Sequence, residues 1–252
     1  MASSTGKVAA YVVLTLTYAF AGGSQLLFGV FLLFGSLHIV NLGGSAATVL
    51  GVDTGLSLVF FVQHSVMVRK RFRKQLARFL PAHYNPAFYA IVSGATLFFV
   101  VICWQESAHI LVALHGPVRW LFRVVFLLGV AGMAWGVRSL LGFDAFGIRH
   151  IRYYLRGRTP RPQPFTVRGP YRWVRHPLYL FTLMMIWSCP DLTLDRLMFN
   201  LLWTAWIVAG TILEERDLLE DLGDDYRAYQ RQVPMLIPWR LRPVRTIDTT
   251  TT

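Results

Sequence analysis

The chain has 252 residues, of which 54% are apolar, 14% aromatic and 15% charged, and its mean hydropathy is +0.45. This composition lies outside the range of soluble globular domains and indicates an integral membrane protein. A net charge of +12 would suggest nucleic acid for a soluble protein, but here the basic residues cluster between apolar runs. Because cytoplasmic loops of membrane proteins have this pattern, we expect no nucleic-acid partner.

The N-terminal part predicts two membrane helices. Residues 8–40 are apolar almost throughout and are broken at 22–24 by two glycines and a serine, so we expect one helix that bends there. Residues 41–51 are predicted as a glycine-rich turn, followed by a second apolar run at 56–68.

Gln63 and His64 lie deep within the second apolar run. Polar side chains are costly in hydrocarbon unless they face other helices. Gln63 and His64 could therefore form hydrogen bonds between helices, or they could have a functional role. Cys103 and Cys189 have no paired spacing for a metal site or a disulfide framework, so no metal is expected.

The distribution of basic residues predicts the topology of the chain. Six basic residues lie between Arg69 and Arg78, and further spans are expected at 87–104 and 118–141. The positive-inside rule then predicts a multi-pass protein of the bacterial inner membrane with both termini in the cytoplasm. On this arrangement the cytoplasmic segments are 69–78, 149–175 and 216–245, and the opposite segments are 41–51 and 105–117.

The last apolar region is predicted to form a helix-turn-helix hairpin with arms at 178–189 and 197–213. Its first arm has about a dozen residues, fewer than the roughly 20 that cross a bilayer. We therefore predict an all-α integral membrane protein of five to six transmembrane helices. Residues 1–141 would form a four-helix membrane region, and residues 142–252 a catalytic region with a cofactor pocket on the cytoplasmic side.

The run from Gly169 to Tyr179, GPYRWVRHPLY, has a composition that neither a lipid-facing core nor an ordinary loop explains. Gly-Pro forces a turn, and Arg175 and His176 precede a proline that starts a helix with free backbone N–H groups. An anion could bind there, because the helix dipole and a forked arginine donor both favour it. Alternatively, the arginines mark the cytoplasmic end of a helix, which leaves the interleaved aromatic residues unexplained.

Glu214 and Glu215 stand where the last membrane helix emerges. Two carboxylates near a helix C-terminus oppose the helix dipole, so a partner is expected. A ribose hydroxyl, a cation and Arg175 are the alternatives, as is a solvated helix end neutralised by Arg216. The tail that follows contains Tyr226, Tyr229 and Trp239 and is expected to be amphipathic and to lie over the site.

Taken together, GPYRWVRHPLYL and the downstream EERDLLEDLGDDYRAYQRQVPMLIP resemble the membrane methyltransferases typified by isoprenylcysteine carboxyl methyltransferase. That superfamily combines an R-H-P motif, a membrane hairpin, an E-E pair, a G-x-x-Y-x-x-Y motif and V-P. The matching region spans residues 163–238. The resemblance implies S-adenosylmethionine in a cytoplasm-facing pocket that the tail closes, with the acceptor arriving from the membrane.

Three further segments resemble the bacterial methanethiol S-methyltransferase branch of the superfamily. They are QHSVM at 63–67, DAFGIRH at 144–150, and a W-x-x-P-x-x-T turn beginning at Trp187. The resemblance assigns the acid that contacts the cofactor to Glu214 rather than to Glu215. In full, the cofactor contacts that it implies are Gln163, Phe165, Thr166, Tyr171, His176, Pro177, Leu178, Tyr179 and Glu214.

Two positions depart from the superfamily pattern. Phe181 replaces a glycine, which could narrow the pocket, and Gly210 stands where carboxyl methyltransferases have an arginine that binds the substrate. A buried carboxylate needs a cationic partner, whereas an uncharged thiol does not. The sequence therefore favours a small apolar acceptor, with Gln63 and Gly210 as candidate substrate-binding positions.

The predicted reaction is methylation of methanethiol to dimethyl sulfide. The nucleophile is then a thiolate, whose generation requires a base or a positive field. His64, Asp144, Arg175 and His176 are the unranked catalytic candidates. Two alternatives stay open, namely methylation of a prenylcysteine carboxylate or a lipid amine, and a non-catalytic membrane protein related to denitrification. The oligomeric state is not predicted.

Overall fold

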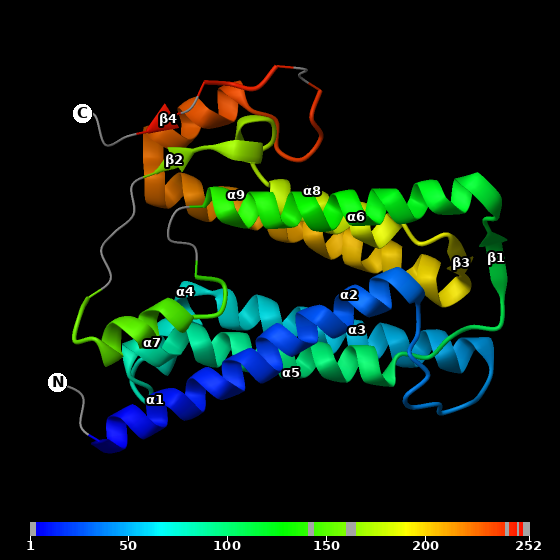
Figure 1. Ribbon diagram of the computed structural model, residues 1–252, viewed down its shortest axis with the longest axis horizontal. Coiled ribbons are helices and arrows are strands. Elements are labelled where there is room, and N and C mark those ends of the chain that lie inside the picture. The colour runs from blue at the N-terminus through cyan, green and yellow to red at the C-terminus, as the bar shows by residue number, and fades with distance from the viewer. Residues whose placement is uncertain (1–3, 141–143, 160–164, 240–241, 246, 249–252) are drawn as a thin grey trace. The chain divides into compact units, whose positions relative to one another are not determined.

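The computed structural model describes residues 4–140, 144–159, 165–239, 242–245 and 247–248 (Figure 1). Helices dominate the described chain. They are α1 (Ser4–Thr17), α2 (Gly23–Phe34), α3 (Ala46–Val68), α4 (Lys70–Leu76), α5 (Asn85–Cys103), α6 (Gly116–Ser139), α7 (Ile148–Leu155), α8 (Pro177–Trp187) and α9 (Leu194–Gln232), with a π-helical turn at Tyr18–Gly22 and short 3₁₀ turns at Ala82–Tyr84 and Gly169–Arg172.

Five helical segments are long and apolar enough to cross a membrane. Helix α8 is also apolar but has only 11 residues. The chain is therefore a helical, multi-pass membrane protein, as its composition predicts. The five segments are Ser4–Phe34, Ala46–Val68, Ala82–Cys103, Gly116–Ser139 and Leu194–Gln232.

The two largest differences from the predicted boundaries are at the start of α3 and the end of α9. Helix α3 begins at Ala46, ten residues before the predicted start, because the Ser45 side chain caps it by accepting from the Thr48 N–H. The expected turn at 41–51 was therefore wrong in its second half. Helix α9 also continues far beyond residue 213 and changes direction at Gly223, whose φ of 57° a side chain would disfavour.

The chain divides into two compact units that interleave along the sequence. The first comprises Met1–His109, Asp144–Pro162 and Thr193–Phe199, and the second comprises Ile110–Phe143, Gln163–Leu192 and Asn200–Thr252. These units are defined by packing alone. The predicted division of function at residue 141 stays a prediction.

The first unit has an aromatic core with polar groups satisfied inside it. Phe31, Trp104 and Phe199 are buried and meet edge to face. Arg196 is 2% exposed, donates to the carbonyls of Phe31 and Leu32, and lies over the Phe31 ring. It thereby supplies donors to carbonyls of the last turns of α2, of which that of Phe31 also accepts from the Gly35 N–H.

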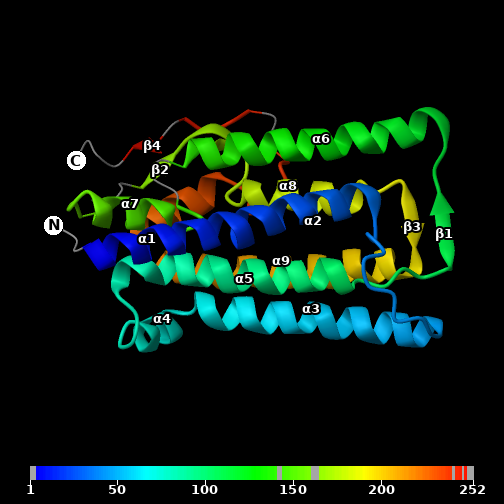
Figure 2. The same cartoon turned by 60° about the horizontal axis from the view of Figure 1, so that its bottom comes forward.

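In the second unit, α6 and α8 lie side by side through a seam of glycines (Figure 2). A Cβ on Gly132 would collide with the ring of Phe181. A Cβ on Gly129 or on Gly136 would likewise collide with a side chain of α8. Small residues let membrane helices approach closely. The bulky Phe181 is therefore accommodated by α6.

Four short strands complete the described fold. They are β1 (Ile110–Ala113), β2 (Thr166–Val167), β3 (Asp191–Thr193) and β4 (Ile247–Asp248), and they pair as β1 with β3 and as antiparallel β2 with β4. At the β3 end, Arg119 and Asp191 form a forked ion pair with N···O distances of 2.6 and 2.7 Å. This pair fixes the start of α6 to the segment after α8.

Candidate functional site

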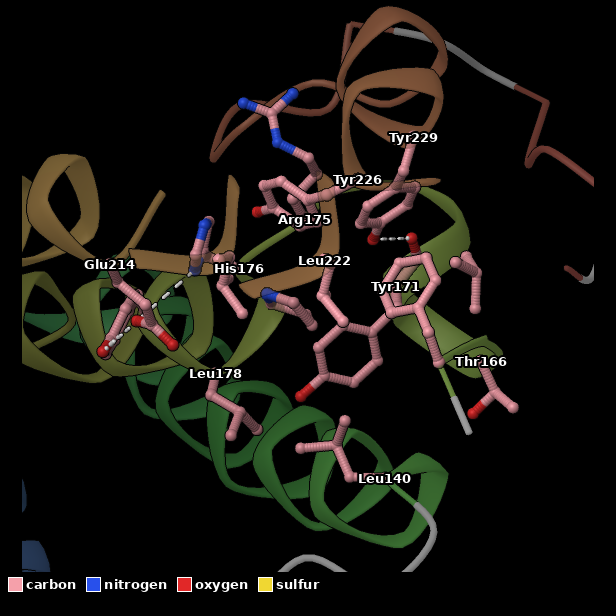
Figure 3. A pocket seen from close by; sticks show the side chains of 15 residues that line it. Leu140, Thr166, Tyr171, Arg175, His176, Leu178, Glu214, Leu222, Tyr226 and Tyr229 are labelled. Carbon is pink, nitrogen blue, oxygen red and sulfur yellow. Dashed lines mark hydrogen bonds and ion pairs between the residues drawn. The ribbon is translucent and has the colours of Figure 1, made fainter. Parts of the chain in front are cut away.

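A cavity of about 500 Å³ lies in the second unit (Figure 3). Its walls come from the end of α6, the β2 segment, the GPYRWVRHPLY motif and the outer part of α9. The volume suits a ligand of drug size. The lining residues are Leu140, Phe165, Thr166, Val167, Tyr171, Arg175, His176, Pro177, Leu178, Tyr179, Glu214, Leu218, Leu222, Tyr226 and Tyr229.

The motif reaches the cavity through a turn that only glycine permits. Gly169 has a φ of 54°, and a Cβ there would overlap the hydroxyl of Ser139 at the end of α6. Pro170 then starts a 3₁₀ turn, and Pro177 occupies the first position of α8, where its missing N–H costs nothing. The loop between them presents Arg175 and His176.

The loop is also tied to the tail by its backbone. The Arg175 N–H donates to the Pro234 carbonyl at 2.8 Å, and the His176 N–H donates to the Met235 carbonyl at 3.1 Å. The V-P-M segment therefore completes the R-H-P loop, although the two lie almost 60 residues apart in sequence.

Glu215 is the centre of the hydrogen-bond network. The Arg175 guanidinium donates to both carboxylate oxygens at 2.8 and 2.7 Å, and the Nε2 atom of His176 lies 2.7 Å from Oε1. The Tyr226 hydroxyl and the Gln230 amide donate at 2.7 Å each. Arg175 also donates to the Gln230 and Val233 carbonyls. One carboxylate thus connects the motif loop to both sides of the kink in α9.

This network is largely closed to solvent. The side chains of Arg175 and Glu215 are each 11% exposed, and that of His176 is 5% exposed. A buried pair of this kind gains little over an apolar core, but removal of one partner leaves an uncompensated charge. Arg175 and Glu215 cancel each other, so neither adds net charge to the cavity.

Glu214 has a different environment from its neighbour. Its Oε2 atom accepts from the Tyr179 hydroxyl at 2.7 Å and lies 3.7 Å from His176 Nδ1. The side chain is 44% exposed, and among the described residues Oε1 has no hydrogen-bond partner. Glu214 is thus the acid that remains available to a ligand.

Tyrosine rings form much of the remaining wall. The Tyr229 hydroxyl donates to the Tyr171 carbonyl at 2.6 Å, and Tyr226 and Tyr229 pack edge to face against Phe165. Burial, and secondarily the charge of Glu214, raises the pKa of the Tyr171 phenol. Tyr171 therefore stays protonated and can donate a hydrogen bond.

The C-terminal segment pairs with β2, whose residues belong to the cavity wall. Ile247 pairs with Val167 in the β2–β4 ladder, while Val244 exchanges backbone and side-chain hydrogen bonds with Arg172. Tyr226 and Tyr229 of the predicted tail line the cavity, but Trp239 is 69% exposed and does not.

The structure brings most of the predicted cofactor residues into this one cavity. Arg175, predicted as catalytic, also lines it, and Gln163 lies outside the described residues. Gly210 is one helical turn before Glu214 on α9 but is not a lining residue. The eight predicted cofactor residues that line it are Phe165, Thr166, Tyr171, His176, Pro177, Leu178, Tyr179 and Glu214.

The remaining candidates belong to the first unit. The Tyr89 hydroxyl lies 2.9 Å from Nε2 of His64, and Gln63 donates to Ser93 at 3.1 Å, so both residues join α3 to α5. Asp144 accepts from the Arg149 and His150 backbone N–H groups and caps the start of α7. Its carboxylate also contacts Nδ1 of His150 at 2.9 Å.

Sequence reasoning missed four lining residues, although a helical pattern identifies two of them. Leu218 and Leu222 follow Glu214 at intervals of four, before the kink at Gly223. That spacing places side chains on one helix face. Leu140 and Val167 carry no comparable signal, because their positions depend on tertiary packing.

The chain matches one family model and several known proteins. Residues 54–234 match the family model described as NnrU protein. A methanethiol S-methyltransferase from a Pseudomonas species is 34% identical over 75% of this chain and 73% of its own length, and one from Mycobacterium tuberculosis is 34% identical over 72% and 75%. Nurim from Rattus norvegicus is more distant, with 26% identity over 66% of each chain. No solved structure matches the chain significantly.

The hydrogen-bond network predicts that Glu215 stabilises the fold of the second unit. Glu215→Ala should lower the free energy of unfolding by about 3–5 kcal/mol, because Arg175 would be left buried without its counter-charge. Thermal unfolding in detergent measures this. Glu220→Ala, an exposed acid of the same helix, is the matched control and should change little. Equal melting temperatures for the two variants would contradict the role of Glu215.

Proposed function

Because the chain belongs to the NnrU protein family and to the family of its methanethiol S-methyltransferase relatives, we propose that it catalyses the same reaction. The substrate is methanethiol, the methyl donor is S-adenosylmethionine, and the product is dimethyl sulfide. The observation that carries the proposal is the cavity itself, which gathers eight residues that sequence similarity assigns to the methyl donor.

The lining fits S-adenosylmethionine chemically. Arg175 is neutralised by Glu215, so Glu214 gives the cavity a net negative character that favours a sulfonium cation. The free carboxylate oxygen of Glu214 can accept from a ribose hydroxyl or an amine. Tyrosine faces attract both flat rings and cations, which suits an adenine and a sulfonium.

When bound, S-adenosylmethionine would supply a methyl group on a positively charged sulfur. Attack of the thiolate sulfur on that methyl carbon would break the bond to the sulfonium sulfur and release S-adenosylhomocysteine. The protein must therefore hold the donor, exclude water and remove the thiol proton. His176 is suited to the last task. If its Nε2–H donates to Glu215, Nδ1 is left as an acceptor, and Glu214 at 3.7 Å stabilises the imidazolium that forms.

The structure gives less support to the other catalytic candidates than to His176. All three guanidinium nitrogens of Arg175 bind Glu215 or tail carbonyls, so we assign it a positioning role for the motif loop. His64 and Asp144 belong to the first unit and stay predictions, as does the substrate-binding role of Gln63.

Gly210 supports an uncharged acceptor. Apart from the adjoining residues of α9, a Cβ built at this position would meet no described atom within 4 Å, so close packing against another helix does not account for the glycine. It lies on the same face of α9 as Glu214, one turn away. An arginine there would suit a carboxylate acceptor, and its replacement by glycine disfavours carboxyl methylation. The available Glu214 argues against a non-catalytic protein.

The methyl acceptor is tested directly with purified protein in detergent. We expect labelled S-adenosylmethionine and methanethiol to give labelled dimethyl sulfide in the headspace. A prenylcysteine analogue and a lipid amine are run in parallel. Methylation of either in place of methanethiol, or no turnover with any acceptor, would overturn the proposal.

We place the basic segments and both termini in the cytoplasm of the bacterial inner membrane, following the positive-inside rule. Single cysteines at Arg73 and Arg158, in a variant without Cys103 and Cys189, report the side of each segment. Impermeant maleimide should label neither in intact cells and both in inverted vesicles. Labelling of either from the periplasm would contradict this topology.

Glu214 is predicted to bind the methyl donor. Glu214→Gln should weaken S-adenosylmethionine binding about 10- to 100-fold, since a charge-assisted hydrogen bond is worth about 1.5–3 kcal/mol. Calorimetric titration measures the affinity, with Glu220→Gln as the control for loss of one acid from α9. An unchanged dissociation constant for Glu214→Gln would remove this assignment.

His176 is predicted to act as the base. His176→Gln keeps a donor for Glu215 but should lower kcat about 100-fold or more, with donor affinity changed only a few-fold. Below the pKa of the free thiol, the residual rate should rise about tenfold per pH unit, because the thiolate must then form in solution. A merely structural role would lower donor affinity and melting temperature together and give no such pH profile.

Gly210 is predicted to control access of the acceptor. Gly210→Arg should abolish thiol methylation because a long cation would occupy the open space, while donor binding at Glu214 survives. Gly210→Ala should retain most activity, since a methyl group has room there. Undiminished turnover by a folded Gly210→Arg protein would contradict the assignment.

A further inference from the structure

The segment from Arg69 to Leu80 is a basic surface that methyl transfer does not explain. Helix α3 ends at Val68, and Arg69 adopts an extended conformation with a ψ of 139° before α4 begins. The break separates α4 from the axis of α3 (Figure 2). Because α3 is a membrane-spanning segment, α4 begins at the level where the hydrocarbon ends.

Helix α4 carries cations and apolar side chains on the same short element. Lys70, Arg71, Arg73 and Lys74 are exposed, whereas Phe72 and Leu76, four residues apart, are half-buried on one face. Phe79 lies in the turn after α4, three residues beyond Leu76, and is 87% exposed. An amphipathic helix with a cationic polar face is typical of segments that lie in the membrane interface.

Three of these cations, Arg71, Arg73 and Lys74, lack an acidic partner among the described residues. The chain has no acidic residue between Asp53 and Glu106. The positive-inside rule requires cations on this side of the membrane but not a helix that displays them beside an exposed phenylalanine.

We propose that α4 and Phe79 form a binding surface for the headgroups of anionic phospholipids. The arginines and lysines hold the phosphate and its charge, and the Phe79 ring inserts among the acyl chains. The partner is a lipid of the surrounding bilayer rather than a nucleic acid, because the surface adjoins a membrane span and includes an exposed apolar ring. The proposal does not depend on the reaction proposed above.

The test uses full-length protein in a neutral detergent and titrates phosphatidylglycerol and phosphatidylcholine of identical acyl chains, with native mass spectrometry as the readout. Wild type should bind phosphatidylglycerol at least about tenfold more tightly. The variant Arg71→Gln/Arg73→Gln/Lys74→Gln should lose roughly 100-fold in phosphatidylglycerol affinity, and wild-type binding should weaken with salt. Phosphatidylcholine affinity should not change.

Matched variants separate this surface from net charge. Arg216→Gln/Arg227→Gln/Arg231→Gln removes three exposed cations from α9 and should retain lipid selectivity. Phe79→Ala should weaken both lipids alike, and melting temperatures check that every variant folds. Equal losses for the two triple variants, equal affinity of wild type for both lipids, or a short RNA that displaces phosphatidylglycerol would overturn the proposal.

Discussion

The candidate site depends on the hydrogen bonds and the ion pair that Glu215 forms with Arg175 and His176. These interactions join a loop after β2 to a helix 40 residues later and, through Tyr226 and Gln230, to the segment beyond the kink at Gly223. Without them a cation would be buried unpaired. Because Tyr226 and Tyr229 line the cavity, the cavity is complete only when the part of α9 beyond the kink is held in place.

Helix geometry explains why the adjacent acids Glu214 and Glu215 have different environments. Consecutive residues on a helix point about 100° apart, so Glu215 can face the motif loop while Glu214 faces the cavity. The buried acid is saturated by four residues, and the exposed acid keeps a free oxygen. The Glu215 carboxylate thus stabilises the fold. The Glu214 carboxylate can bind a ligand without breaking the hydrogen bonds of Glu215.

The sequence predicted the membrane class and most helices, and eight residues that it proposes for cofactor binding line one cavity, because apolar runs and short motifs are local signals. It could not choose the partner of the acid pair from three alternatives, since Arg175 reaches Glu215 only through tertiary folding. It also assigned no structural role to Glu215. Likewise, the sequence suggested that Phe181 could narrow the pocket. In the structure the Phe181 ring packs against Gly132, which lies about 50 residues earlier and belongs to no motif.

The charge balance of the second unit connects the fold to the choice of acceptor. Arg175 is the guanidinium in the cavity wall, and Glu215 neutralises it. With glycine at position 210, none of the other described lining residues offers a free arginine or lysine to a second carboxylate. A carboxylate acceptor would then lie near Glu214 without compensation, and like charges at short range repel. A neutral thiol meets no such penalty, and a cationic donor is attracted by the same acid.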